Sequence, residues 1–540
     1  MNQHLTLLAT WLLAVPAYGQ TPSADLVLFN GRIITSDPSR PTAQALAIQN
    51  DRILAVGSTQ EIEPLATPRT RRMDLRGRTV IPGFNDAHYH FSPPAPGHRL
   101  KFEAMDPSRA DLVTSLARAV ATAPAGEWIF GAVGPLVVLD ATVDRAALDA
   151  LSSAHPVLLQ AFYGHGYIAN SLALSRLGIS DEQADPAGGY FERTGTSRRI
   201  NGRFWEYAQW TPARWLANQA SQESALAALR TMNAEAVRFG ITSLQIFSTL
   251  RIDRFTELLR KADLDIRVRA IPFALTSGAR RDVTEIGALA TLPASGSKLT
   301  IGGIKWVLDG TPFERGAALR EDYSDRSGWR GMLNFPRHEI DSMIGESIDA
   351  DQQLLVHAVG DKTIDEVLAA MERRKIPAGT WPAKRLRIEH GDGLEGDLLA
   401  RARKLGIVVV QNPTHFADAE LFARRWGTNK QLLRSLLEAG VHVAIGSDGA
   451  MNPFANIMFA VTHPANPREA LSRAQALQAY TLGAAFAEFS EQYKGSISAG
   501  KLADIAVLSQ DPLAAPIATL PSLHSVLTIV GGRIVHEEKW

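Results

Sequence analysis

The amino-acid sequence predicts an α/β fold: a (β/α)8 TIM-type barrel with a large insertion after its first strand, plus a small β-sandwich domain formed by both chain ends. Three observations predict this fold. Apolar runs of strand length alternate with helical segments through the middle of the chain, both ends consist of short strand-like segments, and polar side chains with metal-binding chemistry follow several apolar runs. The 540 residues, 45% of them hydrophobic, can build a large core and more than one domain.

Residues 1–19 have the pattern of a cleaved secretory signal peptide. The segment Leu5–Val15 is almost wholly apolar, and Ala17 and Gly19 are small residues at the two positions that a signal peptidase reads. The apolar segment is too short for a stable membrane span. We therefore expect a periplasmic or secreted protein. Because no Lys or Arg precedes the apolar run, a disordered or membrane-tethering tail is the alternative. The absence of cysteine suits export and excludes disulfides, Cys-zinc sites and a Cys nucleophile.

Residues 20–79 and 495–540 are predicted to form one composite β-domain. Near the N-terminus, strand-like segments flank turn residues at Asn30-Gly31 and Asn50-Asp51, and near the C-terminus they flank Gly531-Gly532. Neither end holds enough apolar surface to fold alone, so the simplest arrangement is a single domain built from both. The strand-like segments are Asp25–Ile34, Ala45–Ile53, Asp504–Leu508, Val526–Val530 and Arg533–Val535.

Residues 80–494 are predicted to form the barrel. Helical segments separate most of its apolar runs, and two of these helices, Glu223–Phe239 and Gln431–Ala439, are followed by glycine, the usual stop at a helix C-terminus. Alternating strands and helices with wholly apolar strands favour a parallel sheet buried on both faces. The eight expected strands are Val80–Phe84, Ile241–Phe247, Ile266–Ala274, Ile301–Leu308, Leu354–His357, Leu386–His390, Ile407–Gln411 and His442–Ile445.

The insertion is expected at about residues 92–238, because the stretch between Phe91 and Arg238 is far too long for one barrel loop and its helix. It contains two strand-like segments of its own, Trp128–Phe130 and Val157–Phe162. Aromatic residues gather towards its end, which indicates either core packing or a lid over an apolar substrate. These residues are Phe204, Trp205, Tyr207, Trp210 and Trp215.

His88 and His90 are the first candidates for chemistry. They lie two residues apart in Asp86–His90 at the end of the expected first barrel strand, so both imidazoles point the same way. Imidazole is the commonest protein ligand of zinc-like metals. This pattern alone is weak, because a histidine at a strand end can also cap carbonyl groups.

Similar residues follow four other strands. His357, His390 and Asp448 end the fifth, sixth and eighth expected strands, and Lys305 lies on the fourth. Each has an ordinary structural explanation: a histidine caps carbonyls, an aspartate begins a helix and a lysine forms an ion pair. Active sites of these barrels lie at the C-terminal ends of the strands, so the five strands together predict one divalent-metal site.

Longer motifs surround these residues. They are Pro82–His90, Gly164-His165 with Asn170-Ser171, Lys305 with Asp309-Gly310, His357 with Gly360-Asp361, Glu389-His390-Gly391, Gly446-Ser447-Asp448, Tyr480-Thr481 and Gly500–Asp504. In these motifs the sequence resembles the amidohydrolase superfamily, and within it amidohydrolase family 3, the branch that includes N-substituted formamide deformylases. The resemblance runs through nearly the whole chain after residue 19.

The resemblance implies a ligand set and a reaction. His88 and His90 would bind the more buried metal together with Asp448. Lys305, carboxylated by CO2 to a carbamate, would bridge to a second metal held by His357 and His390. One or two divalent ions, zinc being the first expectation, would activate a water, and Asp448 would take its proton.

The implied activity is hydrolysis of a C–N bond, of amide or N-acyl type, in a small organic substrate. The same metal site also suits a lyase, an isomerase or an ester or lactone hydrolase, because a metal polarises carbonyls as readily as it activates water. A non-catalytic binding protein is the third alternative, although it would need no proton acceptor at Asp448.

Four further residues are candidates for substrate contacts. His165 is expected to be a catalytic residue that contacts the substrate or an oxyanion. The sequence departs from the branch nearby, because Tyr163 stands where the branch usually has an acidic residue. His415, Glu206 and Trp205 are candidates for substrate binding. For Glu206, a helix cap or a salt bridge is an equally good interpretation. For Trp205, the alternative is core packing. With a formal net charge of zero, no nucleic-acid partner is expected, and the sequence leaves open whether the chain forms a homo-oligomer.

Overall fold

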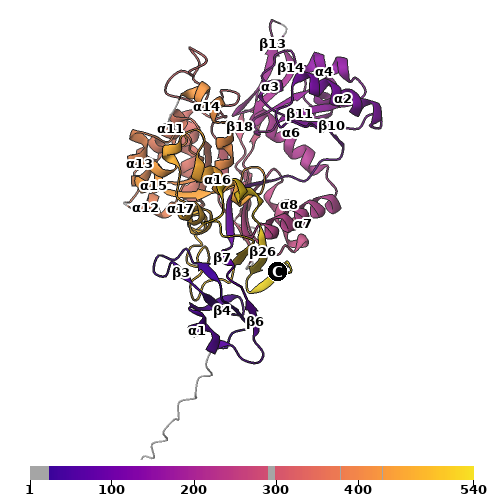
Figure 1. The fold of residues 1–540 in the computed structure, drawn as a ribbon. Coiled ribbons are helices and arrows are strands. Elements are labelled where there is room, and N and C mark those ends of the chain that lie inside the picture. The colour runs from indigo at the N-terminus through magenta and orange to yellow at the C-terminus, as the bar shows by residue number, and fades with distance from the viewer. Residues whose placement is uncertain (1–22, 197, 290–297, 378, 428–429) are drawn as a thin grey trace, which may run out of the picture.

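The computed structural model describes residues 23–196, 198–289, 298–377, 379–427 and 430–540. The predicted signal peptide lies outside the described residues. The chain has a mixed α/β fold in which a small β-rich domain combines strands near both ends of the described chain, a central region alternates strands and helices, and an inserted domain projects from it (Figure 1). Within the described part of the chain, no helix is both long and apolar enough to cross a membrane.

Strands from both chain ends share one sheet of the small domain. Strand β7 (Thr79–Pro82) pairs in parallel with β2 (Arg32–Ile34) and antiparallel with β25 (Ile505–Leu508). A second sheet has the order β5-β4-β1-β6. Leu28 and Leu46 of that sheet share one hydrophobic cluster with residues of the first sheet. The β-sandwich itself stays a prediction. The remaining strands are β1 (Leu26–Phe29), β3 (Thr42–Ala43), β4 (Ala45–Gln49), β5 (Arg52–Gly57), β6 (Arg71–Asp74), β26 (Ser525–Val530) and β27 (Arg533–Glu537).

The prediction that Val80–Phe84 forms the first barrel strand was wrong. The structure divides this apolar run between β7 of the small domain and β8 (Phe84–Phe91), which pairs with β15 (Ile241–Ser248). The chain changes sheets at Gly83, whose amide donates to the Asp504 carbonyl. A Cβ on Gly83 would lie 2.2 Å from the Thr242 side chain, so only glycine fits there. The motif of His88 and His90 therefore lies within a strand rather than after one.

The central strands form two parallel sheets. One has the order β19-β16-β15-β8 and the other β20-β21-β22-β23-β24. They meet at a parallel bridge between Phe273 and Lys305, and on the other side the amide of Asp448 donates to the His88 carbonyl at 2.9 Å. Among the residues that the structure describes, no ladder joins β24 to β8, so the closed barrel stays a prediction. The strands are β16 (Arg267–Pro272), β19 (Leu299–Ile301), β20 (Ile304–Val307), β21 (Leu354–Ala358), β22 (Arg387–His390), β23 (Val408–Gln411) and β24 (His442–Ile445).

Helix α7 (Gln222–Arg238) illustrates how the chain returns to the central sheets. The Ser221 side chain accepts a hydrogen bond from the Ser224 amide and so caps the first turn. Leu229 and Met232 are buried in the main hydrophobic core. The chain then turns into β15 at Gly240, whose φ of +76° favours glycine.

The insertion contains a six-stranded sheet of its own between β8 and β15, with the order β13-β14-β12-β11-β10-β9. The two expected strands appear as β10 (Ile129–Val133) and β11 (Val157–Ala161). Helix α6 (Tyr207–Asn218) leads back from this sheet to α7. The other strands are β9 (His98–Arg99), β12 (Gly166–Ala169), β13 (Gly189–Thr194) and β14 (Arg199–Glu206).

Candidate metal centre

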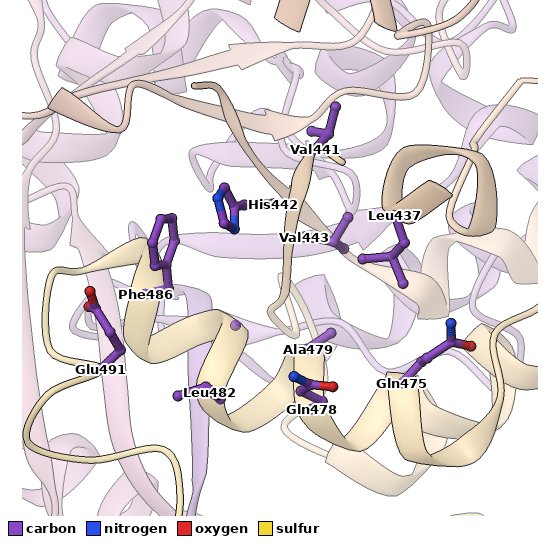
Figure 2. A pocket seen from close by; sticks show the side chains of 11 residues that line it. Leu437, Val441, His442, Val443, Gln475, Gln478, Ala479, Leu482, Phe486 and Glu491 are labelled. Carbon is purple, nitrogen blue, oxygen red and sulfur yellow. The ribbon is translucent and has the colours of Figure 1, made fainter. Parts of the chain in front are cut away.

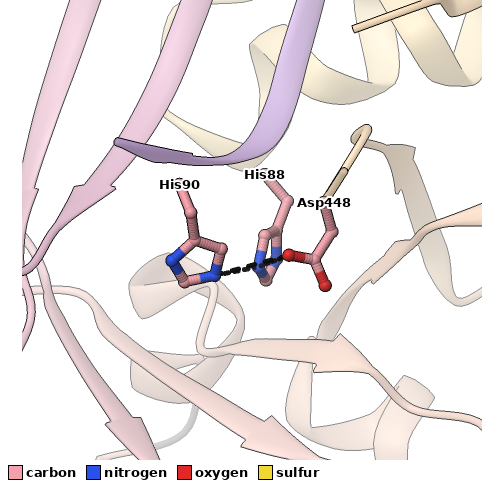
Figure 3. A group of neighbouring side chains, drawn as sticks. All are labelled: His88, His90 and Asp448. Atoms are coloured by element: carbon pink, nitrogen blue, oxygen red, sulfur yellow. Dashed lines mark hydrogen bonds and ion pairs between the residues drawn. The ribbon is translucent and has the colours of Figure 1, made fainter. Parts of the chain in front are cut away.

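His88, His90 and Asp448 converge at the edge of the central sheets (Figure 3). Nε2 of His88 lies 3.5 Å, and Nε2 of His90 3.4 Å, from Oδ1 of Asp448. The two Nε2 atoms are 3.2 Å apart. His88 is fully buried, whereas the His90 side chain is 42% exposed, so the group opens to solvent on the His90 side.

The local backbone explains this convergence. His88 and His90 alternate along β8 and so lie on one face of it. Asp448 follows β24 with a φ of +40°, a left-handed conformation that a non-glycine residue adopts only when its surroundings hold it there. Asp86 ties the two strands together, since its carboxylate accepts hydrogen bonds from the Ser447 amide at 2.9 Å and the Tyr480 hydroxyl at 2.9 Å.

Glu389 holds His88 from behind. Its Oε2 lies 2.7 Å from Nδ1 of His88, and Arg387 donates to both of its carboxylate oxygens at 2.8 and 3.0 Å. All three side chains are completely buried. A carboxylate on Nδ1 fixes the ring and directs the lone pair of Nε2 towards the site, an arrangement typical of metal-binding histidines. Sequence reasoning did not assign this role, although Arg387 and Glu389 alternate on one buried strand, β22.

His390 and His357 extend the group. Nε2 of His390 lies 3.7 Å from Oδ2 of Asp448, and the His357 and His390 ring centroids are 4.6 Å apart. His390 has a φ of +71°, which turns its side chain out of the strand alternation. The second sheet thus adds two imidazoles to the two of β8, as the strand-end pattern predicted.

Lys305 lies in the same interior. Its side chain is 1% exposed, and Nζ lies 4.7 Å from the Phe247 ring centroid. Burial lowers the pKa of Lys305 to about 8, although the Glu389 and Asp448 carboxylates act in the opposite direction. A lowered pKa increases the fraction of Lys305 that is a neutral amine at neutral pH.

Burial disfavours the charged form of the imidazoles of His88, His90, His357 and His390. Burial lowers the pKa of His88, His357 and His390 well below the ordinary value, and the charge of Lys305 lowers it further. Burial would raise the pKa of Asp448, but the positive charge that His88, His90 and His415 can carry outweighs burial and holds this pKa below its usual range, which favours the ionised carboxylate. Neutral imidazole and ionised carboxylate are the protonation states that metal ligands need.

Asp309 supports the loop that follows β21, the strand that carries His357. Its carboxylate accepts hydrogen bonds from the amides of Val359 at 3.0 Å and Gly360 at 2.8 Å and from the Thr363 hydroxyl at 2.6 Å. Oδ1 of Asp309 also lies 3.8 Å from Nε2 of His357. Burial raises the pKa of Asp309 to about 7, against the opposing effect of these hydrogen bonds. Asp309 belongs to a quoted motif, and its contacts indicate a structural role.

The structure brings two of the four substrate-contact candidates to this group. The His165 ring centroid lies 4.6 Å from that of His357, and Nε2 of His415 lies 3.8 Å from Oδ2 of Asp448. Glu206 contacts His165 instead of facing the other histidines. Trp205 packs in the hydrophobic cluster of the insertion, and its indole N–H donates to Glu192, which indicates core packing.

A separate apolar pocket of about 350 Å³ lies at the other end of β24 (Figure 2). His442, the first residue of this strand, lines the pocket with Leu437, Val443 and Phe486, whereas Asp448 follows the last residue of the strand. The pocket therefore lies away from the converging histidines.

The donor set of the histidine group fits a divalent metal of the zinc type. It combines imidazole nitrogens with a carboxylate oxygen, and these donor atoms lie in groups of three that are close enough together to bind one ion. His88, His90 and Asp448 form one such triplet, and His390, His415 and Asp448 form a second.

Known proteins resemble this chain over most of its length. Protein LONG AFTER FAR-RED 3 of Arabidopsis thaliana is 29% identical, over 90% of this chain and 87% of its own length. N-substituted formamide deformylase of Arthrobacter pascens is 27% identical, over 96% of this chain and 99% of its own. A crystal structure of an uncharacterized metal-dependent hydrolase from Pyrococcus horikoshii has the same fold, with a TM-score of 0.70 and 22% identity over 91% of this chain and 99% of that one.

The family assignment follows from a family model that matches most of the chain. The family model described as "Amidohydrolase family" matches residues 71–536, which include every strand of the central sheets and all the converging side chains. The chain is a hydrolase that belongs to the amidohydrolase family.

Proposed function

We propose that this hydrolase uses one or two divalent metal ions, zinc in the first place, to cleave a C–N bond of amide or N-acyl type in a small organic substrate. The observation that carries the proposal is the convergence of His88, His90 and Asp448 within 3.5 Å, with Glu389 on the far nitrogen of His88. A non-catalytic binding protein would need no proton acceptor such as Asp448 in a group that opens to solvent on one side.

The proposed ligands follow the strands. His88, His90 and Asp448 would hold one ion, and His357 and His390 a second, with Lys305 between them. When bound, a divalent metal lowers the pKa of a coordinated water to about 7 and polarises a substrate carbonyl. The carboxylate of Asp448 would accept a proton at Oδ2, the oxygen nearer to His390 and His415, and deliver it to the departing nitrogen.

We also propose that Lys305 carries a carbamate. An ammonium group has three donors and no lone pair, so plain lysine cannot be a ligand in this buried group of histidines. The ammonium group first loses one proton, and the neutral amine then forms an N–C bond with CO2 and releases a second proton. The product is a carbamate whose two oxygens share one negative charge, in place of one cation. The 1% exposure of Lys305 and its position on β20 beside β21, which carries His357, support this role.

The chemistry of the bond rests on the similarity to the N-substituted formamide deformylase, which covers 96% of this chain. Amide hydrolysis demands protonation of a poor leaving group, and a carboxylate already in the site provides a route for that proton. Esters and lactones have better leaving groups and are the second candidate class.

The predicted signal peptide supports a periplasmic or secreted location.

A product-resolved screen tests the proposed function. The metal-loaded protein is incubated with matched substrates that share one amine or alcohol portion: N-substituted formamides, acetamides, carbamates, and the corresponding esters and lactones. We expect release of free amine from an amide, abolished by a chelator and restored by added metal. Turnover confined to esters or lactones would assign the second class, and a product formed without net addition of water would contradict hydrolysis.

A further inference from the structure

A buried carboxylate, that of Glu206, contacts one ring nitrogen of His165. Nδ1 of His165 lies 2.9 Å from Oε1 and 3.1 Å from Oε2 of Glu206, and both residues are almost fully buried. One ring nitrogen is therefore committed to the protein. Among the described residues, no hydrogen bond engages the other nitrogen, Nε2.

Three features of the structure hold Glu206 in place. Glu206 joins β14 to α6 with a φ of +53°, a conformation that non-glycine residues seldom adopt. The Asn334 side-chain amide donates to Oε2 of Glu206 at 3.0 Å. A Cβ on Gly310 would lie 2.9 Å from Oε1 of Glu206, so this close approach requires glycine. A strained residue fixed on several sides is a common feature of functional sites.

The anchored ring lies against the metal-ligand candidates. The centroids of His165 and His357 are 4.6 Å apart, and the rings are tilted by 42°. The Gly164 carbonyl accepts a hydrogen bond from Gln209 at 2.7 Å, which fixes the backbone beside His165. The insertion thus delivers one oriented imidazole to the edge of the central sheets.

We propose that Glu206 is a positioning residue that acts through His165. It accepts the Nδ1–H hydrogen bond, which fixes the ring and leaves Nε2 to contact the polar group of the substrate beside His357. Glu206 is almost fully buried and both of its oxygens contact His165 or Asn334, so we place it behind His165 rather than against substrate. The kinetic part of this inference rests on the proposed function, whereas the hydrogen bond between His165 and Glu206 can be tested independently of it.

Glu314 provides both an alternative and a control. Donor atoms of His165, Glu206 and Glu314 lie within 4.8 Å of one another, so the three could instead hold a metal. The Glu314 carboxylate, however, accepts its hydrogen bonds from the Thr311 amide and hydroxyl rather than from His165. Glu314→Gln therefore removes a neighbouring carboxylate without removing the His165 contact.

The test combines a double-mutant cycle with a direct view of the hydrogen bond. His165→Ala, Glu206→Ala, the double variant, Glu206→Gln and Glu314→Gln are compared in the metal-loaded full chain, with circular dichroism to check folding. On whichever substrate the wild type turns over, we expect Glu206→Ala to lower kcat by about 10²-fold with little change in KM. The double variant should be no slower than His165→Ala. Glu206→Gln keeps an oxygen acceptor and should recover part of the loss, and Glu314→Gln should lose less than tenfold.

The second readout does not need activity. In protein labelled with ¹⁵N-histidine, the Nδ1–H signal of His165 should disappear in His165→Ala, shift or broaden in Glu206→Ala and persist in Glu314→Gln. Independent, additive losses in the double variant, or equal losses in Glu206→Ala and Glu314→Gln, would overturn the positioning role. Loss of bound metal from both glutamate variants would assign the cluster as a metal site instead. If the wild type hydrolyses no amide, the proposed function fails, whereas the NMR result still decides whether Glu206 holds His165 by this hydrogen bond.

Discussion

The Glu389 carboxylate lies 2.7 Å from Nδ1 of His88, while Nε2 of the same ring lies 3.5 Å from Asp448. One imidazole is thereby held between two carboxylates of different function. Glu389 forms an ion pair with Arg387 and orients the His88 ring, whereas Asp448 is one of the donors that converge on the candidate metal centre. The metal-binding geometry therefore depends on residues that would not themselves bind metal.

Glu389→Gln should weaken metal binding by about 10- to 100-fold, because the amide cannot hold His88 in the same tautomer with the same negative charge. Competition with a chromogenic chelator measures the affinity. Glu366→Gln is the matched control, since this carboxylate pairs with Arg337 at 2.9 Å on the outer helix α11 (Asp361–Arg373). Unchanged affinity in a folded Glu389→Gln protein would refute the orienting role.

Asp448→Asn should reduce kcat by on the order of 10³-fold or more, because it removes a proton acceptor and a ligand charge together. Steady-state kinetics at saturating metal measure this loss. His415→Asn is a useful comparison, since Nε2 of His415 lies 3.8 Å from the same carboxylate but on the outer side of the group. Near-normal turnover in the Asp448→Asn protein, once folding is verified, would mean that another group transfers the proton.

Much of this site could be predicted from the sequence, because ligands at strand ends are a local signal. His88, His90, His357, His390, Lys305 and Asp448 follow or occupy apolar runs, and the structure gathers them. The sheet switch at Gly83 could not be predicted, since one apolar run gives no sign of where its partner strand changes. Glu314 and Asn334 lie in a long irregular segment, whose contacts with the insertion depend on tertiary packing rather than periodicity.

Lys305→Ala should lose the second metal first, and short carboxylates such as acetate should restore part of the activity by occupying the vacant volume. Wild-type protein equilibrated with ¹³C-bicarbonate should show one carbamate carbon signal by NMR, absent from the variant. The reason is the buried position of Lys305 beside imidazoles, where a cation would repel metal. A wild-type protein with full metal and activity but no carbamate signal would contradict this prediction.

The proposed export predicts a processed N-terminus. Protein recovered from the periplasm or medium of the native host should begin near Gln20, because Ala17 and Gly19 occupy the positions that a signal peptidase reads. N-terminal sequencing or mass spectrometry of the intact chain measures this. Recovery of an intact Met1 on the exported protein would argue for the tethering alternative.

Elemental analysis of the purified wild type beside His88→Ala and His90→Ala tests the metal centre most directly. The two imidazoles come from one strand and face the same carboxylate at 3.5 and 3.4 Å. We predict one or two divalent ions per wild-type chain, and a loss of bound metal together with turnover in each variant. Full metal content in both folded variants would contradict the assignment of this group as the metal centre.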